Sequence, residues 1–368
     1  MLNELVESLV HELCDRLAVT AGIAETAKGM SIAFTSERGR IERDYFADES
    51  SPDAYIAAFL VPNAAKTIQC LLEMDAMGLI PRKEAVDVLD IGTGPGTSIL
   101  AASIFFSRRY PDTAVRFAGI ERSREALLAA HELFKIIAPP NHHFESATKE
   151  ISPGELKAIM RGHRFDISIA ANVLNELSSD DACDLCQDII SDHLADSGAL
   201  LVIDPALKET ARPLMGIRDR LVSENLSVAA PCLSQGSCPM LAANDRDWCH
   251  FYIDWKCPEY LSELDRLSGM NHKHLKMSYF VFTRESRVTS HESRKWRVVS
   301  SPLVSKGKRE LMLCGENGKL MKAARLDRDA SDKNADLARA KRGDIVRCGY
   351  KKRISMDDSL SIEIPWDR

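Results

Sequence analysis

The feature that most constrains the fold of this chain is the segment Val86 to Thr97, which holds Gly92, Gly94 and Gly96. Its first half, Val86 to Asp90, predicts a buried strand, and Thr97 to Arg109 after it predicts a helix. The three glycines make the turn between them. Glycine lets the backbone of such a turn approach a ligand closely, because no side chain stands between. The segment therefore predicts a ligand-binding strand–turn–helix unit.

The spacing of the glycines indicates which ligand this turn serves. Turns that bind dinucleotides have two residues between their second and third glycines, where a pyrophosphate is held. Here a single residue, Pro95, separates Gly94 from Gly96. That spacing is typical of methyltransferases, whose loop wraps the methionine and ribose parts of S-adenosylmethionine (SAM). We therefore predict a SAM site that includes Asp90, Gly92, Gly94 and Gly96.

Two later strand ends support a SAM site. Phe117 to Glu121 predicts a strand that ends in a carboxylate, which can accept hydrogen bonds from both ribose hydroxyls. Phe165 to Ala171 predicts the fourth strand, and Asn172 at its end borders the expected position of the methyl group. We therefore predict that Glu121 and Asn172 also bind the cofactor. The alternative is a glycine-rich turn that serves no ligand.

The residues after the fourth strand leave catalysis open. Methyl transfer can proceed by in-line displacement with little more than positioning. Enzymes that methylate amino groups of bases often have Asn or Asp, two prolines and an aromatic residue at this point. Here Asn172 is followed by Val173, Leu174, Asn175 and Glu176. The polar side chains could line the site or could cap the next helix, so the sequence names no catalytic residue.

Alternating strands and helices predict the fold class. Beyond the glycine turn, strands are expected at 115–120, 165–171, 199–203 and 278–283, and helices at 123–135 and 181–193. This rhythm predicts an α/β fold: a doubly wound sheet of the class I methyltransferase type, with helices on both faces. We expect an N-terminal helical region at 1–80 and a SAM-binding Rossmann-like domain at 81–284, with a cysteine-rich insert at 231–257. Short β-like runs at 296–299 and 310–313 predict a small, basic, β-rich C-terminal module at 285–368.

The ten cysteines indicate metal or cluster binding better than a disulfide framework, because their spacing is irregular. Cys232, Cys238 and Cys249 lie in an irregular, turn-rich segment in which thiolates can converge on one centre. The candidates for a fourth ligand are His250, Cys257, Cys314 and Cys348. Spacing does not decide between zinc and an iron–sulfur cluster. Cys14 and Cys70 follow helical patterns and are expected in the core, and Cys183 and Cys186 are interpreted as ordinary cysteines of a helix.

Charge is unevenly distributed along the chain. Residues 284–368 hold 21 Lys and Arg against 13 Asp and Glu, a net charge of +8, whereas residues 1–283 hold 27 against 41, a net charge of −14. A basic appendage on an acidic body favours a polyanionic partner, although it could also be a solvated tail. The apolar runs, such as Ala54 to Val61, are too short to span a membrane. A cytoplasmic location is expected, or the mitochondrial matrix if an import segment was removed.

Several of these segments together give a resemblance to a known family. The chain resembles the methyltransferase-like assembly factors of the small ribosomal subunit, a family with mitochondrial and bacterial members. The matching pieces are 89–97, 172–177, 230–232, 238–239, 247–251, 277–279, 313–314 and 342–344. One departure is Phe59 to Pro62, where the family tends to have an arginine before the proline, and another is a somewhat long gap between the central cysteines.

The resemblance implies a class I methyltransferase domain that binds SAM and a 4Fe–4S cluster held by four cysteines. Carried over by position, the cluster ligands are Cys232, Cys238, Cys249 and Cys314. It also implies association with the rRNA and proteins of the small ribosomal subunit. The leading hypothesis is therefore an iron–sulfur-containing factor for small-subunit assembly that associates with rRNA and uses SAM as a ligand or as a methyl donor. The alternatives are a non-catalytic rRNA-binding scaffold and a small-molecule methyltransferase with a structural zinc.

Overall fold

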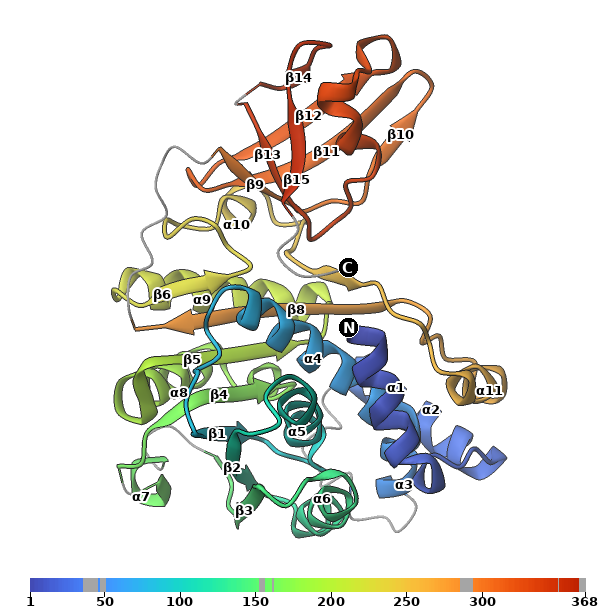
Figure 1. The fold of residues 1–368 in the computed structure, drawn as a ribbon, viewed down its shortest axis with the longest axis vertical. Helices are drawn as coiled ribbons and strands as arrows, with labels where there is room; N and C mark the ends of the chain where they lie inside the picture. Colours follow the sequence, from blue (N-terminus) through green and yellow to red (C-terminus); the bar gives the residue numbers. More distant parts are fainter. Residues whose placement is uncertain are drawn as a thin grey trace. The chain divides into compact units, whose positions relative to one another are not determined.

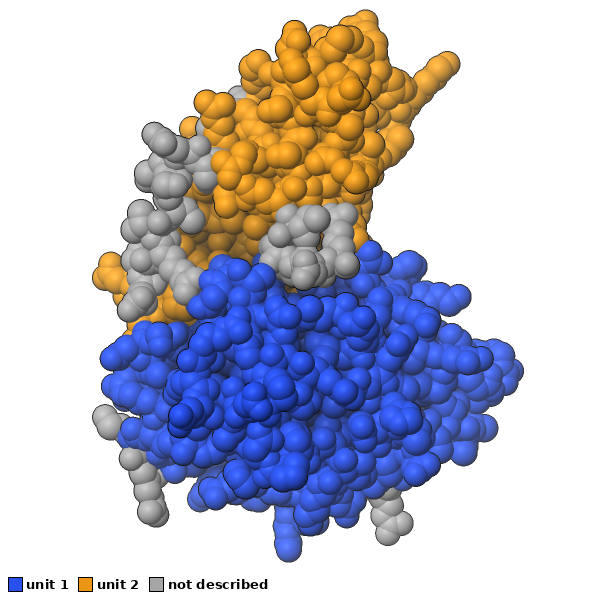
Figure 2. Space-filling model, in the orientation of Figure 1, with its two compact units in different colours: residues 1–203, 253–275 blue, residues 204–252, 276–368 orange. Residues whose placement is uncertain are grey.

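The computed structural model describes residues 1–35, 46, 51–151, 156–160, 162–284, 294–349 and 351–363. The chain forms two compact units: residues 1–203 with 253–275, and residues 204–252 with 276–368 (Figure 2). These limits differ from the three parts expected from the sequence, because the expected domain at 81–284 contributes to both units. We therefore describe each unit by itself.

Helices open unit 1, as the apolar spacing of its first eighty residues predicts. They are α1 (Leu2–Glu12), η1 (Cys14–Arg16), α2 (Ala21–Thr35), α3 (Ser51–Tyr55), η3 (Ile56–Leu60) and α4 (Val61–Ala76). The π-helical turn η3 comes directly before Pro62, which stands in the first turn of α4 and lacks the N–H that a regular helix would use. Helix Ser51–Ala76 is long and apolar enough to cross a membrane, but 72% of its apolar window is buried in the fold. Burial of this kind is what a core helix requires.

The rest of unit 1 alternates strands and helices (Figure 1). In order these are β1 (Ala85–Ile91), α5 (Thr97–Arg109), β2 (Ala114–Glu121), α6 (Arg124–Ile137), β3 (His142–Thr148), α7 (Leu156–Met160), β4 (Phe165–Ala171), η4 (Leu174–Glu176), α8 (Ser179–Asp188), η5 (Ile189–His193), β5 (Leu194–Asp204) and α11 (Glu259–Ser268). Its strands pair in parallel in the order β3-β2-β1-β4-β5. This arrangement confirms the predicted doubly wound α/β fold, a class I methyltransferase-type sheet.

Strand β1 lies at the centre of this sheet and holds the core together. Val86, Val88, Leu89 and Ile91 are fully buried, and each apolar side chain of this size contributes about 1.5–3 kcal/mol when it leaves water. The chain runs outward from β1 to β2 and β3, then returns to β4 on the other side of β1. The carboxyl ends of β1 and β4 are therefore neighbours at the point where the strand order reverses, which is where α/β sheets bind ligands.

Unit 2 contains most of the cysteine-rich insert, up to Tyr252, and the predicted β-rich module. Its elements are α9 (Lys208–Ser223), β6 (Ser227–Ala230), α10 (Pro239–Ala243), β7 (Phe251–Ile253), β8 (Leu275–Thr283), β9 (Lys295–Val298), β10 (Leu303–Ser305), β11 (Lys308–Gly315), β12 (Leu320–Leu326), η6 (Asp327–Asp329), η7 (Asp332–Ala338), β13 (Ile345–Cys348), β14 (Arg353–Ile354) and β15 (Leu360–Glu363). β8 pairs with β7 and, antiparallel, with β6. The module is a sheet in the order β14-β12-β11-β9-β13-β15, with β10 on β11, around a core that includes Trp296, Leu313 and Val346.

Candidate cofactor pocket and cysteine site

The glycine turn follows β1 as predicted, and its first glycine has a steric reason. The N–H groups of Gly92 and Thr93 both donate to the carbonyl oxygen of Ile120, at 2.9 and 3.1 Å, which folds the turn over the end of β2. Gly92 has φ +67°, and a Cβ there would lie 2.2 Å from Cγ2 of Val173. Any side chain at this position would therefore meet both backbone strain and a direct clash.

The other predicted loop residues have different surroundings. Gly94 has φ +52°, lines the pocket, and would have open space around an added Cβ. At Gly96 an added Cβ would lie 3.3 Å from the backbone of Ala130, so this glycine allows α5 and α6 to approach closely. Asp90 is buried, and its Oδ2 has no hydrogen-bond partner among the described residues. Burial and the charge of Glu121 raise the pKa of Asp90 well above its usual range.

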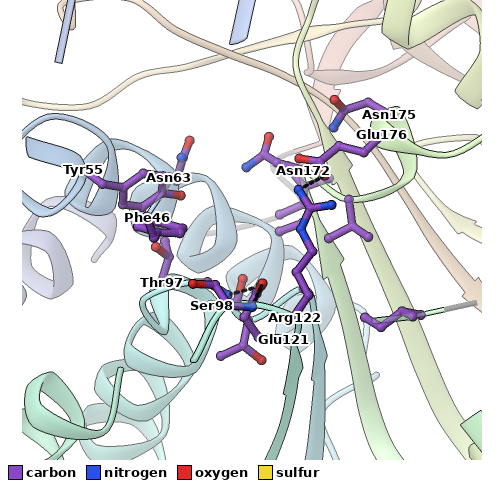
Figure 3. A pocket seen from close by; sticks show the side chains of 18 of the residues that line it. Phe46, Tyr55, Asn63, Thr97, Ser98, Glu121, Arg122, Asn172, Asn175 and Glu176 are labelled. Carbon is purple, nitrogen blue, oxygen red and sulfur yellow. Dashed lines mark hydrogen bonds and ion pairs between the residues drawn. The ribbon is translucent and has the colours of Figure 1, made fainter. Parts of the chain in front are cut away.

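A pocket of about 410 Å³ opens at the carboxyl ends of these strands, within unit 1. That volume is in the range of pockets that hold small molecules and cofactors. Four predicted cofactor-binding residues line it, namely Gly92, Gly94, Glu121 and Asn172. The other two predicted residues, Asp90 and Gly96, are not among the described residues that line it. Figure 3 shows Tyr55 and Asn63 on one wall and Asn172 with Glu176 on the opposite wall, with Glu121 between them.

The carboxylate of Glu121 is held in a fixed orientation. Its Oε2 accepts the Gly94 N–H at 2.9 Å and its Oε1 accepts the Ser123 N–H at 2.9 Å. Each carboxylate oxygen has a second lone pair, so two further donors from a ligand could bond to it. This arrangement can accept a pair of vicinal hydroxyls, as predicted for the end of this strand.

The wall after β4 carries polar groups that the sequence left undecided. Asn172 has φ +60°, in the left-handed region that asparagine tolerates better than most residues, and its N–H donates to the carbonyl of Ile203 at 2.7 Å. Glu176 lies 3.9 Å from Arg122 in an ion pair that Figure 3 draws. Asn175 lines the same wall. These side chains therefore belong to the pocket, whatever they also do for the next helix.

The helices before β1 supply a wall that sequence reasoning missed. Tyr55, Asn63 and Lys66 line the pocket from α3 and α4. The Lys66 ammonium donates to Oδ1 of Asn63 at 2.9 Å, and burial lowers the pKa of Lys66 to about 8. Burial also raises the pKa of Tyr55. The polar residues Asn63 and Lys66, one turn apart in helix α4, are the sequence signal for this wall.

The four predicted ligand cysteines influence one another in unit 2. Burial raises the pKa of Cys249 well above its usual range, and the thiols of Cys232, Cys238 and Cys314 raise it further. Burial raises the pKa of Cys314 to about 12, with further contributions from Cys232 and Cys238. The thiols are therefore within electrostatic reach of each other. Within the described ranges, no three His, Cys, Asp or Glu side chains are placed closely enough to hold a single metal ion.

Two buried arginines hold the cysteine loop. Arg218 is 1% exposed, donates to the carbonyls of Ser234 and Gly236, and pairs with Asp219 at 2.7 Å. Arg297 lies opposite Cys314 in the β9–β11 ladder and donates from Nε to the carbonyl of Pro231 at 3.0 Å. Both positive charges lower the pKa of Cys232 and Cys314 against the larger effect of burial. They would stabilise thiolates at this site.

The alternative fourth ligands have other neighbours. Cys348 lies in the apolar core of the module, and burial and Asp358 raise its pKa to about 12. Cys257 belongs to unit 1, and burial and Asp265 raise its pKa. Burial and Arg342 lower the pKa of His250 to about 4. These placements favour Cys314. Cys70 is buried, as expected, and so are the helix cysteines Cys183 and Cys186. Cys14 is exposed in η1, so the expectation that it lies in the core was wrong.

Ion pairs neutralise part of the positive charge of the C-terminal module. Lys308 and Lys322 lie 2.8 and 3.3 Å from Glu310, and Lys295 lies 2.8 Å from Glu363. The net charge of +8 over residues 284–368 nevertheless leaves more cations than carboxylates. The excess, and not the raw count of basic residues, is what could attract a polyanion.

Comparison with protein families gives one match that spans most of the chain. The family model described as mitochondrial small ribosomal subunit Rsm22 matches residues 54–346. The matched range includes the glycine turn, the cysteine-rich insert and most of the β-rich module. No curated protein matches the sequence.

Solved structures are similar to the chain at low sequence identity. A ribosomal protein L11 methylase from Lactobacillus delbrueckii is 15% identical, with a TM-score of 0.34, over 60% of this chain and 80% of that one. A magnesium protoporphyrin IX methyltransferase from Synechocystis with bound SAM is 12% identical, with a TM-score of 0.36, over 70% and 97%. A SAM-dependent methyltransferase from Agrobacterium tumefaciens is 12% identical, with a TM-score of 0.38, over 60% and 62%.

Proposed function

This chain belongs to the Rsm22 family of the mitochondrial small ribosomal subunit, and we propose that it is a SAM-binding, methyltransferase-like factor acting on small-subunit rRNA. The observation that carries the proposal is the pocket at the switch point of a parallel sheet, lined by a methyltransferase-type glycine turn, in a chain of a ribosomal family. The family description also favours the mitochondrial matrix over the cytoplasm expected from the sequence.

SAM fits the chemistry of this pocket. In the proposed complex the ribose hydroxyls donate to Glu121, whose carboxylate the Gly94 and Ser123 N–H groups already orient. The bare backbone of Gly92 and Gly94 lies against the methionine part. Bound there, SAM supplies an electrophilic methyl group. The chain's own residues would orient that group, and the polar side chains of Asn172 and Asn175 would face the incoming acceptor.

Lys66 gives this proposal a test that depends on charge. We propose that its ammonium faces the carboxylate of the methionine part, because a cation at a buried wall is stabilised by an anionic partner. Lys66→Met is then expected to weaken SAM binding by roughly tenfold or more at pH 7, the value of a lost charge-assisted hydrogen bond. The wild-type advantage over the variant should fall as the pH rises above about 8. Calorimetric titration at several pH values measures this ratio, in which ionisation of SAM itself cancels.

The same substitution should stabilise the empty protein. The pKa of Lys66 is about 8 in the folded chain and 10.5 as its ordinary value. Below pH 8 the amine is charged in both states, so folding carries the full cost of burying that charge; above pH 10.5 this cost vanishes. Lys66→Met should therefore melt at a higher temperature than wild type at pH 7, without SAM. A variant that melts lower and binds SAM normally would show that Lys66 has a structural role instead.

We propose that Cys232, Cys238, Cys249 and Cys314 hold a 4Fe–4S cluster. Four mutually influencing thiols, and two buried arginines whose charges favour their ionised forms, are a suitable donor set. A single zinc ion would need its four sulfurs within about 4 Å of one another, given Zn–S bonds of about 2.3 Å. A cluster of four irons accepts thiolates that stand farther apart. In this proposal the cluster connects the insert to β11 and so fixes the basic module on the cysteine loop.

Association with the ribosome can be tested directly. The protein is expected to sediment with small-subunit particles at about 50 mM salt and to be released at about 200 mM, because phosphate contacts release counterions. An unrelated folded RNA of similar length serves as the competitor. Absence from small-subunit fractions at low salt would contradict the proposal for rRNA, whereas retention of SAM binding would leave the pocket assignment intact.

A second candidate function is a non-catalytic rRNA-binding scaffold, and one observation favours it. Where base methyltransferases have a stacking aromatic residue after the fourth strand, this chain has Val173, packed against Gly92. Labelled SAM separates the two functions. Methyl transfer to small-subunit RNA that disappears in Glu121→Ala would establish catalysis, and SAM binding without transfer would support the scaffold.

A further inference from the structure

Three aromatic side chains form a row on one side of the segment that leads into β7. Trp248, His250 and Tyr252 alternate with Cys249 and Phe251, so they share the face opposite the buried Phe251. The ring centroids of Trp248 and His250 are 5.3 Å apart with planes inclined by 30°. Those of His250 and Tyr252 are 5.8 Å apart, with planes inclined by 65°, so the Tyr252 ring meets its neighbour edge-on. The row therefore continues over three rings within unit 2.

The row is fixed at its base and open at its end. The indole N–H of Trp248 donates to the carbonyl oxygen of Ala206 at 2.9 Å, and Nδ1 of His250 lies 3.1 Å from the carbonyl oxygen of Trp248. Tyr252 is 41% exposed, whereas Trp248 and His250 are half-buried. Because the rings are already held in place, they lose little further side-chain freedom when a flat partner binds.

Two cations lie against the exposed ring. The Lys276 ammonium is 5.1 Å from the centroid of the Tyr252 ring, and the guanidinium carbon of Arg342 is 5.6 Å from it. Arg342 is also held in place by a hydrogen bond to the carbonyl of His250, at 3.1 Å. Lys276 is exposed and can reach a phosphate beside the ring. The exposed Asp247 next to Trp248 is an anion, so the cationic end of the row is at Tyr252.

We propose that Trp248, His250 and Tyr252 form a stacking platform for unpaired bases of RNA, with Lys276 and Arg342 contacting the adjacent phosphates. Sequence-tolerant binding of single strands combines aromatic rings with neighbouring cations in this way. The ring planes are inclined by 30° and 65° to one another, so the rings cannot extend one continuous stack of parallel bases, and they suit a strand whose bases have come apart. In a duplex the bases stay stacked on one another, so they are not free to stack on these rings. This inference rests on the proposed rRNA association and names the part of the RNA that is recognised.

The test uses the full-length protein and a fluorescein-labelled single-stranded decamer of uridine, with a duplex of equal length as the second probe. Tyr252→Ala is expected to weaken binding of the single strand by about 5- to 150-fold, the loss measured for one stacked base. Duplex binding should stay within twofold of wild type. Tyr252→Phe keeps the ring and should bind the single strand as wild type does. Fluorescence anisotropy measures the affinity of each variant and of wild type for the two probes.

Salt dependence separates stacking from charge. Tyr252→Ala should leave the slope of log affinity against log salt unchanged, because a ring displaces no counterion. Lys276→Gln should reduce the slope by about 0.7, the value of one phosphate contact on a single strand. Equal weakening of single-strand and duplex binding by Tyr252→Ala, with an unchanged melting temperature, would overturn the platform. If wild type binds small-subunit RNA and Tyr252→Ala binds the single strand equally well, only the platform is refuted. If wild type binds neither probe nor ribosomal RNA, the proposed function is refuted.

Discussion

Gly92→Ala is expected to reduce SAM affinity by roughly a hundredfold or more, the largest effect of any single substitution in the pocket. The added Cβ would lie 2.2 Å from Cγ2 of Val173, a distance at which one of the two must move. Val173 follows Asn172 on the opposite wall, so relief of the clash displaces that wall as well as the loop. Because Gly92 and Asn172 both line the pocket, the SAM-binding surface changes on two sides at once.

Gly78→Ala is the matched control for this substitution. Gly78 has φ +68°, almost the same as Gly92 at +67°, but nothing lies within 4 Å of an added Cβ there. It should lower the free energy of unfolding by about 1–2 kcal/mol through backbone strain alone and leave SAM affinity unchanged. Isothermal titration and thermal melting of both variants give the comparison. If Gly92→Ala loses no more affinity than Gly78→Ala, the glycine turn is not the cofactor-binding loop.

Cys314→Ala is expected to remove the proposed cluster, the second large effect. Anaerobically purified wild-type protein should contain about four irons per chain and absorb near ~400 nm, as thiolate-bound iron does. Loss of one of four thiolates leaves an iron without its protein ligand, so both the iron content and the absorption should fall to background. Metal analysis and a visible spectrum measure the two quantities.

Cys348→Ala distinguishes a ligand from a core cysteine of the same module. Cys348 is buried among Trp296, Leu311 and Val346, so alanine there removes one sulfur from an apolar core. It should lower the stability of the fold and leave the iron content unchanged. A wild-type level of iron in Cys314→Ala, with its loss in Cys348→Ala, would exchange the two assignments. One zinc per chain and no iron in the wild type would replace the cluster by the zinc alternative.

The glycine turn made the centre of the fold predictable from sequence. Strong apolar runs and the glycine-rich turn predict β1, α5 and the ends of β2 and β4, and the structure confirms these elements. β3 was not predicted because its residues, His142 to Thr148, are mostly polar and it lies at the edge of the sheet with one neighbour. α9 was not predicted because it contains Pro213 and few apolar residues in its first turn. Edge strands and proline-containing helices obtain their stability from packing that a local pattern does not record.

The candidate site was predictable in part for the same reason. Gly92, Gly94, Glu121 and Asn172 follow strand ends, so topology alone brings them to one pocket. Lys66 comes from a helix that precedes the sheet, and its place at the pocket depends on how α4 packs on α5. The influence of Cys232 and Cys238 on the pKa of Cys314 likewise depends on tertiary packing across about eighty residues of sequence. In the absence of a resemblance, nothing local distinguishes Cys314 from Cys348.

The long-range bonds of Arg297 and Arg342 set an order of events during synthesis. Arg297 donates to Pro231, 66 residues earlier, and Arg342 donates to His250, 92 residues earlier. At ~5–20 residues per second, a ribosome needs about 3–13 s to make the first of these intervals and longer for the second. For that time the nascent insert has its thiols but neither of these two arginines and not yet Cys314. The insert therefore makes these bonds only after Arg342 has been added, so loading of the proposed cluster would follow the synthesis of the β-rich module.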